Sequence, residues 1–306
     1  MAGKVVIHIE HLRKAYGATV AVEDISFEVY EGEIFGMVGP NGAGKTTATE
    51  CLEGLRAADR GTIKVLGLDP QREAYALRPR LGVQLQESAL HDRLKVWEAL
   101  DLFASFYARA LEPKRLLEQL GLTEKRNAAF AKLSGGQKQR LFIALALIND
   151  PELVFLDELT TGLDPHARHA IWDLVRGIRE KGKTVFLTTH FMEEAERLCD
   201  RVAIVDHGRL VALDSPENLI RKHGGDRRLV FRCDGRIALE HLRQLPGVSR
   251  VAQENSDYTV QSSDDDLVFQ VTSLLHAQGC RLRDLRTEQA TLEDVFLNLT
   301  GRKMRE

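Results

Sequence analysis

The sequence is poor in cysteine and has no long apolar run. Its cysteines are Cys51, Cys199, Cys233 and Cys280. Because no two of them form a C-x-x-C pair, we expect reduced, structural thiols in the cytoplasm rather than a disulfide framework. No apolar stretch approaches the roughly 18 residues that a membrane-spanning helix requires. Residues 1–10 lack the basic start and apolar core of a secretory signal. We therefore expect a chain with neither a membrane span nor a secretory leader.

The chain also lacks an excess of one charge. Its formal net charge is -3 with a pI of about 6.4, which argues against a polyanion binder driven by bulk charge, although a local basic patch is compatible with it. Hydrophobic residues make up 43% and charged residues 28% of the chain, which is typical of globular proteins. The length of 306 residues predicts two domains, one large and one small.

Short apolar runs alternate with helical patterns from Val5 to about Ile220. The runs that predict buried strands are Ile34–Val38, Leu153–Leu156, Val185–Thr188 and Val202–Val205. Such runs, separated by helices, are typical of an α/β fold with a mostly parallel sheet. The half-polar stretches Val5–Glu10 and Ala21–Val29 predict an antiparallel subsheet.

Amphipathic helices are expected between these strands. Their ranges are Val96–Ala110, Gln137–Ile148 and Arg168–Glu180. The last has Asp164 as its predicted N-cap and Pro165 at the first helical position, where a missing N–H costs nothing. A final helix over Leu292–Leu299 begins after Thr291, with Asp294 three residues further on in a capping-box pattern.

The segment His223–Arg228 predicts a hinge, because two glycines and several charges interrupt the pattern there. We place the domains at residues 1–224 and 225–306. The elements expected in the second domain are, in order, a strand at Leu229–Cys233, a helix at Ile237–Leu245, strands at Val248–Gln253 and Tyr258–Gln261, a helix at Asp266–Gln278 and a strand at Arg281–Arg286. This order predicts a small α+β domain of the ferredoxin-like type.

A phosphate-binding motif follows the first buried strand. Residues 39–46 match G-x-x-x-x-G-K-[ST], in which glycines let backbone N–H groups converge on phosphate oxygens. The helix that follows adds its positive N-terminal end. Lys45 can reach the β- and γ-phosphates, and the Thr46 hydroxyl can ligate Mg²⁺. The predicted nucleotide-binding residues of this loop are Gly39, Pro40, Asn41, Gly42, Ala43, Gly44, Lys45, Thr46 and Thr47.

A pair of carboxylates supplies the second half of such a site. The strand Leu153–Leu156 ends in Asp157 and Glu158. Asp157 at the carboxyl end of a strand can help to hold the Mg²⁺ that Thr46 and phosphate oxygens also bind. Glu158 can polarise the attacking water. A solvated Asp-Glu pair that closes a strand is common, but the phosphate motif favours the catalytic interpretation.

The segment Leu133–Gln137 (LSGGQ) lies between these two motifs and precedes an apolar helix. Taken alone, it could be a loop and a helix cap in which Ser134 satisfies backbone N–H groups. In this position it makes the chain resemble the ATP-binding cassette (ABC) ATPases, and the resemblance covers essentially all of the sequence. It implies a P-loop NTPase cassette with a helical subdomain and an antiparallel β-subdomain.

Further residues follow the order of the family. The resemblance implies that Tyr16 stacks on adenine and that Gln86 is the Q-loop glutamine, with Gln84 as a close alternative. It also implies that Asp164 belongs to the D-loop and that His190 contacts the γ-phosphate. The implied catalytic residues are Lys45, Gln86, Glu158 and His190, and the implied Mg²⁺ ligands are Thr46, Gln86 and Asp157.

The resemblance also implies partners. The phosphate site of one subunit would be completed by a second copy, so that two ATP molecules are held in a homodimer. The residues that the second copy would contribute are Ser134, Gly135, Gly136 and Gln137. A separate membrane permease would dock near Gln86–Phe106, which implies export and a peripheral place on the cytoplasmic face of the membrane. No nucleic acid partner is expected.

Two features are less regular. Leu159 stands where the family usually has proline. Its backbone is freer than that of proline, so we expect an effect on rate or dimer geometry rather than loss of activity.

The segment Thr291–Leu297 is similar to the C-terminal extension of ABC-2 exporter ATPases of the daunorubicin-resistance type. It is either a helix that packs down a small domain or a dimerisation or regulatory module.

The main alternative is a non-transport ABC ATPase that acts on nucleic acid or ribosomes. Such proteins usually carry two cassettes, long coiled-coil insertions or zinc-binding cysteines, which the sequence does not have. A P-loop kinase or GTPase does not fit LSGGQ. A binding protein with a degenerate site is disfavoured by the intact Glu158.

Overall fold

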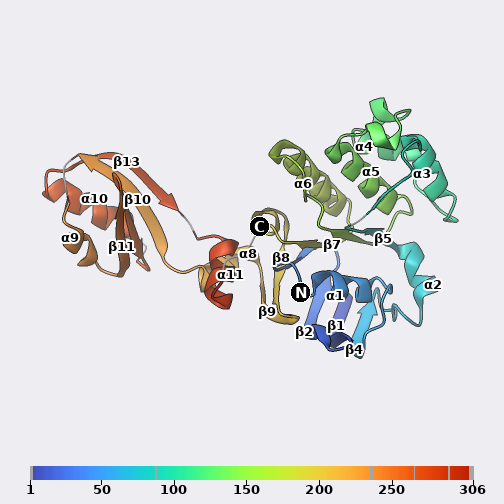
Figure 1. The fold of residues 1–306 in the computed structure, drawn as a ribbon, viewed down its shortest axis with the longest axis horizontal. Helices are drawn as coiled ribbons and strands as arrows, with labels where there is room; N and C mark the ends of the chain where they lie inside the picture. The colour runs from blue at the N-terminus through green and yellow to red at the C-terminus, as the bar shows by residue number, and fades with distance from the viewer. Residues whose placement is uncertain (1–2, 87, 235–236, 265, 289, 303–306) are drawn as a thin grey trace. The chain divides into compact units, whose positions relative to one another are not determined.

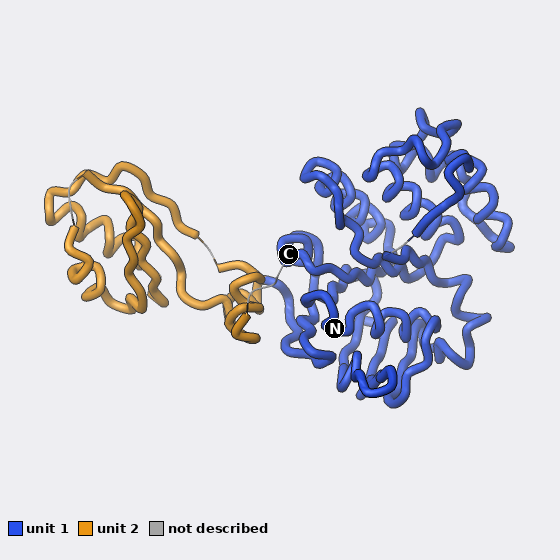
Figure 2. Tube along the Cα trace, viewed as in Figure 1, with its two compact units in different colours: residues 1–216, 304–306 blue, residues 217–303 orange. Residues whose placement is uncertain are grey.

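The computed structural model describes residues 3–86, 88–234, 237–264, 266–288 and 290–302. The ends of both predicted domains, residues 1–2 and 303–306, therefore lie outside the described residues. The chain forms two compact units that divide between residues 216 and 217 (Figure 2). No helix within the described ranges is long and apolar enough to cross a bilayer.

The first unit is built on a nine-stranded sheet with the order β4-β1-β2-β9-β8-β3-β7-β6-β5 (Figure 1). Its strands are β1 (Val5–Tyr16), β2 (Thr19–Tyr30), β3 (Ile34–Val38), β4 (Arg60–Val65), β5 (Leu81–Gln84), β6 (Leu153–Asp157), β7 (Thr184–Thr189), β8 (Arg201–Asp206) and β9 (Arg209–Asp214). Strands β8, β3, β7, β6 and β5 run parallel, whereas β1 pairs antiparallel with β2 and β4. The parallel core and the antiparallel subsheet are thus confirmed.

Burial explains why the two parts of this sheet differ in sequence. Every residue of β3, β6 and β7 is buried, because helices cover the parallel core, whereas buried and exposed residues alternate through much of β1 and β2. An aromatic stack joins the two parts. The ring centroids of Phe27 and Phe35 lie 5.0 Å apart, and those of Phe35 and Phe186 lie 5.6 Å apart. These pairs join the antiparallel subsheet and the parallel sheet in one hydrophobic core.

The helices of this unit are α1 (Lys45–Leu52), α2 (Ala74–Leu77), α3 (Val96–Ala104), α4 (Pro113–Gln119), α5 (Gly135–Leu147), α6 (Pro165–Glu180) and α7 (Met192–Leu198), with short 3₁₀ turns at Arg78–Arg80, Thr123–Lys125 and Phe130–Lys132. The predicted cap of α6 is confirmed, because the Asp164 side chain accepts a hydrogen bond from the Ala167 N–H at 2.9 Å. Helices α3, α4 and α5 form the helical subdomain (Figure 1).

Helix α3 is shorter than the predicted range Val96–Ala110. It ends at Ala104, where Phe106 and Tyr107 donate to carbonyls three residues back instead of four. The Leu111 N–H then bonds to the Ile148 carbonyl at 2.7 Å, at the end of α5. The chain therefore leaves the helix to satisfy a tertiary hydrogen bond, which the periodicity of the sequence does not contain.

The second unit contains a four-stranded antiparallel sheet with the order β11-β12-β10-β13. Its elements are α8 (Pro216–His223), β10 (Arg227–Asp234), α9 (Leu239–Arg243), β11 (Val248–Glu254), β12 (Asp257–Ser262), α10 (Leu267–Ala277), β13 (Arg281–Glu288) and α11 (Leu292–Thr300). The chain order β-α-β-β-α-β, with the first and third strands adjacent in the middle, is ferredoxin-like, as predicted. Thr291 and Asp294 form the expected capping box.

Helix α8 belongs to the second unit from Glu217 onward. The Asn298 amide of α11 donates a hydrogen bond to the His223 carbonyl at 2.8 Å, which ties the end of α8 to α11. Gly225 follows with a φ of 81°, a conformation that glycine adopts without strain. The domain boundary at residue 224 and the hinge over residues 223–228 stay predictions.

Candidate functional site

The phosphate loop is a tight turn between β3 and α1. Gly42 and Gly44 have φ values of 79° and 101°, which side chains other than glycine rarely adopt. A Cβ atom on Gly44 would also lie 2.3 Å from the Ala21 carbonyl oxygen. Helix α1 begins directly afterwards at Lys45, so its free N–H groups point into the loop. The turn therefore has the backbone shape that an anion site needs.

Lys45 is folded back onto this loop. Its ammonium donates hydrogen bonds to the carbonyls of Gly39 at 2.8 Å and Pro40 at 3.1 Å. The side chain is only 4% exposed. Burial lowers the pKa of Lys45, while the carboxylates of Glu158 and Asp157 act in the opposite direction. A phosphate group would replace the two carbonyls with a charged acceptor, which is a stronger partner for the ammonium.

The pocket over the loop is lined by part of the predicted set. Its residues are Thr19, Val20, Ala21, Asn41, Gly42, Gly44, Lys45, Thr46, Thr47, Gln86 and Glu158. Gly39, Pro40 and Ala43 form the base of the loop and do not line the pocket. Residues 19–21 at the start of β2 also line the pocket and were not among the predicted site residues. Nothing in their local sequence marks them, because the pairing of β2 with distant strands brings them there.

Asp157 is the buried carboxylate of the site. It is the last residue of β6 and is 4% exposed. The Thr188 hydroxyl donates a hydrogen bond to it, which the parallel register of β6 and β7 makes possible by setting Asp157 opposite Thr188. Burial raises the pKa of Asp157, and the Thr188 hydrogen bond opposes this rise. Thr188 was not among the predicted site residues. The pair of threonines before His190 is the only local feature of the sequence that points to it.

Side chains from three segments of the chain contact the Glu158 carboxylate. Gln86 donates from its amide to Glu158 Oε2 at 3.0 Å, and the Thr161 hydroxyl donates to the same oxygen at 3.3 Å. His190 Nδ1 lies 3.2 Å from Oε1. The backbone of Glu158 has a φ of 49°, a left-handed conformation that costs energy in a residue with a side chain. The structure thus brings three of the predicted catalytic residues together at one carboxylate.

The two candidate glutamines, Gln84 and Gln86, differ in burial and in hydrogen-bond partners. Gln84 is buried in β5, and its amide donates to the neighbouring Leu85 carbonyl at 2.6 Å. Gln86 is exposed, lines the phosphate pocket and contacts Glu158. The geometry therefore supports Gln86 as the functional glutamine of this segment.

The oxygen donors near Lys45 suit a magnesium ion. Thr46, Gln86 and Asp157 offer a hydroxyl, an amide oxygen and a carboxylate, which are the hard ligands that Mg²⁺ prefers. Because the Gln86 NH₂ group is bound to Glu158, its oxygen is the end left for a metal. Among the described residues, no group of three or more His, Cys, Asp or Glu side chains could hold a metal ion. This donor set fits Mg²⁺ that is held jointly with phosphate oxygens and water.

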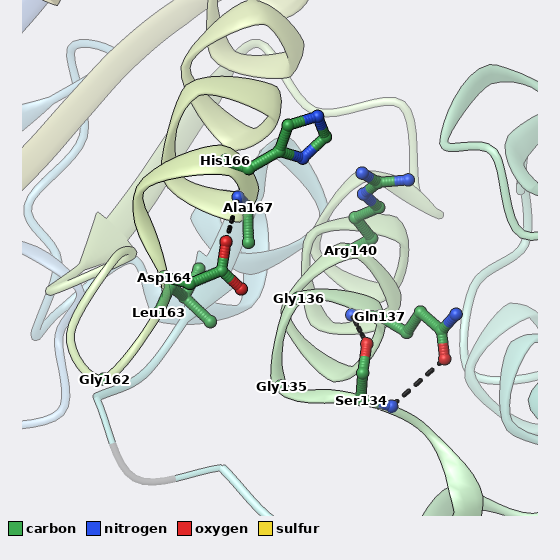
Figure 3. A pocket seen from close by; sticks show the side chains of 10 residues that line it. All are labelled: Ser134, Gly135, Gly136, Gln137, Arg140, Gly162, Leu163, Asp164, His166 and Ala167. Carbon is green, nitrogen blue, oxygen red and sulfur yellow. Dashed lines mark hydrogen bonds between the residues drawn. The ribbon is translucent and has the colours of Figure 1, made fainter.

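A second pocket lies at the start of two neighbouring helices. Its residues are Ser134, Gly135, Gly136, Gln137, Arg140, Gly162, Leu163, Asp164, His166 and Ala167. Figure 3 shows the first turns of α5 and α6 side by side, with Ser134 at one start and Asp164 at the other. A Cβ atom on Gly136 would lie 3.2 Å from the Ala167 Cβ, so this close approach favours glycine. Two positive helix ends and Arg140 therefore face one space.

Ser134 and Gln137 form a capping box at the start of α5. The Ser134 N–H donates to Gln137 Oε1 at 3.0 Å, and the Gln137 N–H donates to Ser134 Oγ at 3.4 Å. The structure thus confirms Ser134 as the cap of this helix, with Gln137 as the second residue of the capping box. The Ser134 hydroxyl keeps its hydrogen for another acceptor, and Ser134 and Gly135 are exposed.

Tyr16 and Leu159 lie at the margins of the site. Tyr16 is half-exposed at the end of β1, and the cations of Lys14 and Arg56 lie 5.6 Å and 5.4 Å from its ring centroid. It does not line the phosphate pocket.

Leu159 is buried directly after Glu158. A proline at position 159 would restrict the backbone angles of Glu158, and leucine does not impose this restriction. The effect of Leu159 on rate or dimer geometry stays a prediction.

The comparisons with known proteins agree with this geometry. Residues 22–161 match the family model described as ABC transporter. The Nod factor export ATP-binding protein I of Mesorhizobium japonicum is 40% identical, over 100% of this chain and 89% of the relative. Its namesake from Rhizobium sp. (strain N33) is 41% identical, over 98% of this chain and 99% of that protein.

A solved structure supports the fold of the first unit. The ATP binding subunit of an ABC transporter superposes with a TM-score of 0.64 and 30% identity, covering 72% of this chain and 93% of that one. Together with the full-length relatives, this likeness accounts for the phosphate loop, the carboxylate pair and the LSGGQ segment at once. The chain therefore belongs to the ABC transporter family, as an ATP-binding subunit whose cassette is an ATPase.

Proposed function

We propose that this protein hydrolyses Mg-ATP as a homodimer and thereby drives export through a separate membrane permease. The observation that carries the proposal is the division of the site into two pockets. Among the described residues, none lines both the phosphate pocket and the LSGGQ pocket. The phosphate loop offers donors to one side of a triphosphate only, and the LSGGQ segment of a second copy would close the other side.

The chemistry follows from the residues of the phosphate pocket. Lys45 and the N–H groups of α1 hold the phosphates, and a bound Mg²⁺ would neutralise charge on them. Glu158 orients the water for in-line attack, and His190, held beside it, contacts the γ-phosphate. In the structure both residues face each other at 3.2 Å, an arrangement that ATP and the second copy would open.

The permease would dock on the helical subdomain, on the cytoplasmic face of the membrane. Large apolar side chains are exposed at Leu85, Leu102 and Phe106, the last with 67% of its surface accessible. Large exposed apolar side chains are common at interaction surfaces. The named relatives are export proteins, which supports export as the direction. Nod factor, the cargo in the names of these relatives, is a candidate cargo for this chain.

The dimer can be tested by a charge at Ser134. Wild-type protein with Mg²⁺ and a non-hydrolysable ATP analogue is expected to sediment as a dimer. Ser134→Glu should bind the analogue normally but remain monomeric, because its carboxylate would face the partner's triphosphate. The matched control is Ser263→Glu, at an exposed serine of the second unit, which should dimerise. A wild-type protein that stays monomeric with bound analogue would refute the shared site.

The role of Tyr16 gives a separate prediction. If Tyr16 stacks on adenine, Tyr16→Ala should raise the KM for ATP about tenfold, within the range that base stacking on an aromatic side chain contributes. Tyr16→Phe keeps the ring and should retain the wild-type KM. The kcat of both variants should be unchanged, because Tyr16 does not line the phosphate pocket. Steady-state ATPase assays measure both constants, and an unchanged KM in Tyr16→Ala would exclude stacking.

A further inference from the structure

Glu194 is a buried carboxyl group that none of the nucleotide motifs includes. It lies on α7, four residues after His190, and is 1% exposed. The Trp172 indole N–H of α6 donates a hydrogen bond to its Oε1 at 3.0 Å. Burial raises the pKa of Glu194, and hydroxyl and indole donors around it act against the rise. Burying an acid is costly, so its place here needs a reason.

The same carboxyl group also lies close to Thr160, in the segment that leads to the D-loop residue Asp164. Thr160, two residues after Glu158, is fully buried, and its hydroxyl is one of the donors that lower the pKa of Glu194. Within the described ranges, neither Thr160 Oγ1 nor Glu194 Oε2 makes a hydrogen bond of good geometry. A buried hydroxyl and a nearby buried carboxyl oxygen that both lack a partner gain stability when a small movement joins them.

The same carboxyl also lies close to the segment that carries His190, the residue that we expect to contact the γ-phosphate and that we call the switch histidine. Thr189, the residue before His190, is buried, and its hydroxyl oxygen accepts from the Phe191 N–H at 3.0 Å. The hydrogen of this hydroxyl is left for another acceptor, and Thr189 is among the donors that lower the pKa of Glu194. Glu194 thus lies between Thr160, at the start of the D-loop, and Thr189, at the start of the switch segment.

Besides Glu194, a second contact links α6 to the segment that carries His190. The Arg168 guanidinium of α6 lies 4.6 Å from the Phe191 ring centroid, and the rings of Phe191 and His190 are 4.1 Å apart. Arg168 also acts electrostatically on Glu194. Because α6 begins at the Asp164 cap, the helix that carries the D-loop contacts both Glu194 and the neighbour of the switch histidine.

We propose that Glu194 is a positioning residue that couples the D-loop to the switch histidine. A movement of the D-loop against a partner subunit would close the Thr160–Glu194 hydrogen bond and pull on Thr189, which sets His190 beside the γ-phosphate. The inference rests on the proposed function, because the coupling matters only where the D-loop meets a second copy. Its physical basis is one buried group shared by two segments of the site.

The test compares Glu194→Gln, Thr160→Val and the double variant. Glu194→Gln keeps the acceptor for Trp172, and Thr160→Val removes only the hydroxyl. Each single variant is expected to lower kcat about five- to tenfold, within the range of such couplings, while the KM for ATP stays within twofold. The double variant should be no slower than the slower single variant, because both remove the same coupling. The control is Glu193→Gln, an exposed acid on the same helix, which should keep its kcat.

Melting temperature and analogue-induced dimerisation are measured on every variant. If Glu194→Gln does not fold, Thr160→Val and Thr189→Val decide the matter, since both are near-isosteric. The inference is overturned if the single variants keep wild-type kcat, if their losses multiply in the double variant, or if KM rises while kcat holds. A wild-type protein that does not dimerise with the analogue would instead count against the proposed function.

Discussion

Replacing Glu158 with glutamine is expected to reduce ATP turnover by about 10²-fold or more, the usual contribution of a positioned general base. The amide has nearly the same shape, so the contacts with Gln86 and Thr161 can persist. It cannot accept the proton of the attacking water. Nucleotide affinity should stay within a few-fold of wild type, because Lys45 and the loop N–H groups are untouched.

The variant should therefore accumulate as an ATP-bound dimer. Single-turnover hydrolysis and sedimentation with ATP and Mg²⁺ measure the two consequences together. The matched control is Glu152→Gln, a partly exposed acid just before the same strand, where it pairs with Arg80. That variant should hydrolyse ATP at close to the wild-type rate. Near-normal hydrolysis by Glu158→Gln would remove Glu158 from its role.

Glu53→Gln is expected to stabilise the protein at alkaline pH. Glu53 closes α1, is 5% exposed, and its Oε1 has no hydrogen-bond partner among the described residues. Burial raises the pKa of Glu53 to about 8, and repulsion by Asp157 and Glu50 adds to the rise. The acid is thus protonated in the folded protein at neutral pH but ionised in the unfolded chain, whose pKa is near 4.5.

The sign of the effect follows from proton binding. Between pH 4.5 and about 8 the folded state holds a proton that the unfolded state has lost, so the free energy of unfolding falls as pH rises through this window. Above that window both states are ionised and the loss is complete. Glutamine has no proton to lose, so the stability of the variant relative to wild type should rise across this window by up to roughly 5 kcal/mol.

Urea unfolding without nucleotide or Mg²⁺, between pH 5 and pH 8.5, measures this difference. Both tryptophans, Trp97 and Trp172, lie in the first unit, so their fluorescence follows the unfolding of the cassette separately from the second unit. Glu193→Gln is the control, because that carboxylate is exposed on α7 and pairs with Arg197 at the surface. Parallel stability curves for wild type and Glu53→Gln would show that Glu53 is ionised in the folded protein.

The sequence by itself determined the elements and most of the motif residues. The strands at Ile34–Val38 and Leu153–Asp157 are encoded by short runs of apolar residues, and the caps at Asp164 and Thr291 by single side chains. Such signals are local, so a stretch of a few residues contains all the information. The order of the phosphate loop, the LSGGQ segment and the carboxylate pair then identified the family.

The tertiary structure alone decided which side chains meet. The bond from Thr188 to Asp157 exists because β6 and β7 pair in a register that no local pattern specifies. The meeting of Gln86 and His190 at Glu158, the choice of Gln86 over Gln84, and the burial of Glu53 and Glu194 arise in the same way. Each depends on the packing of segments that are far apart in the chain, and that packing is a property of the whole sheet and its helices.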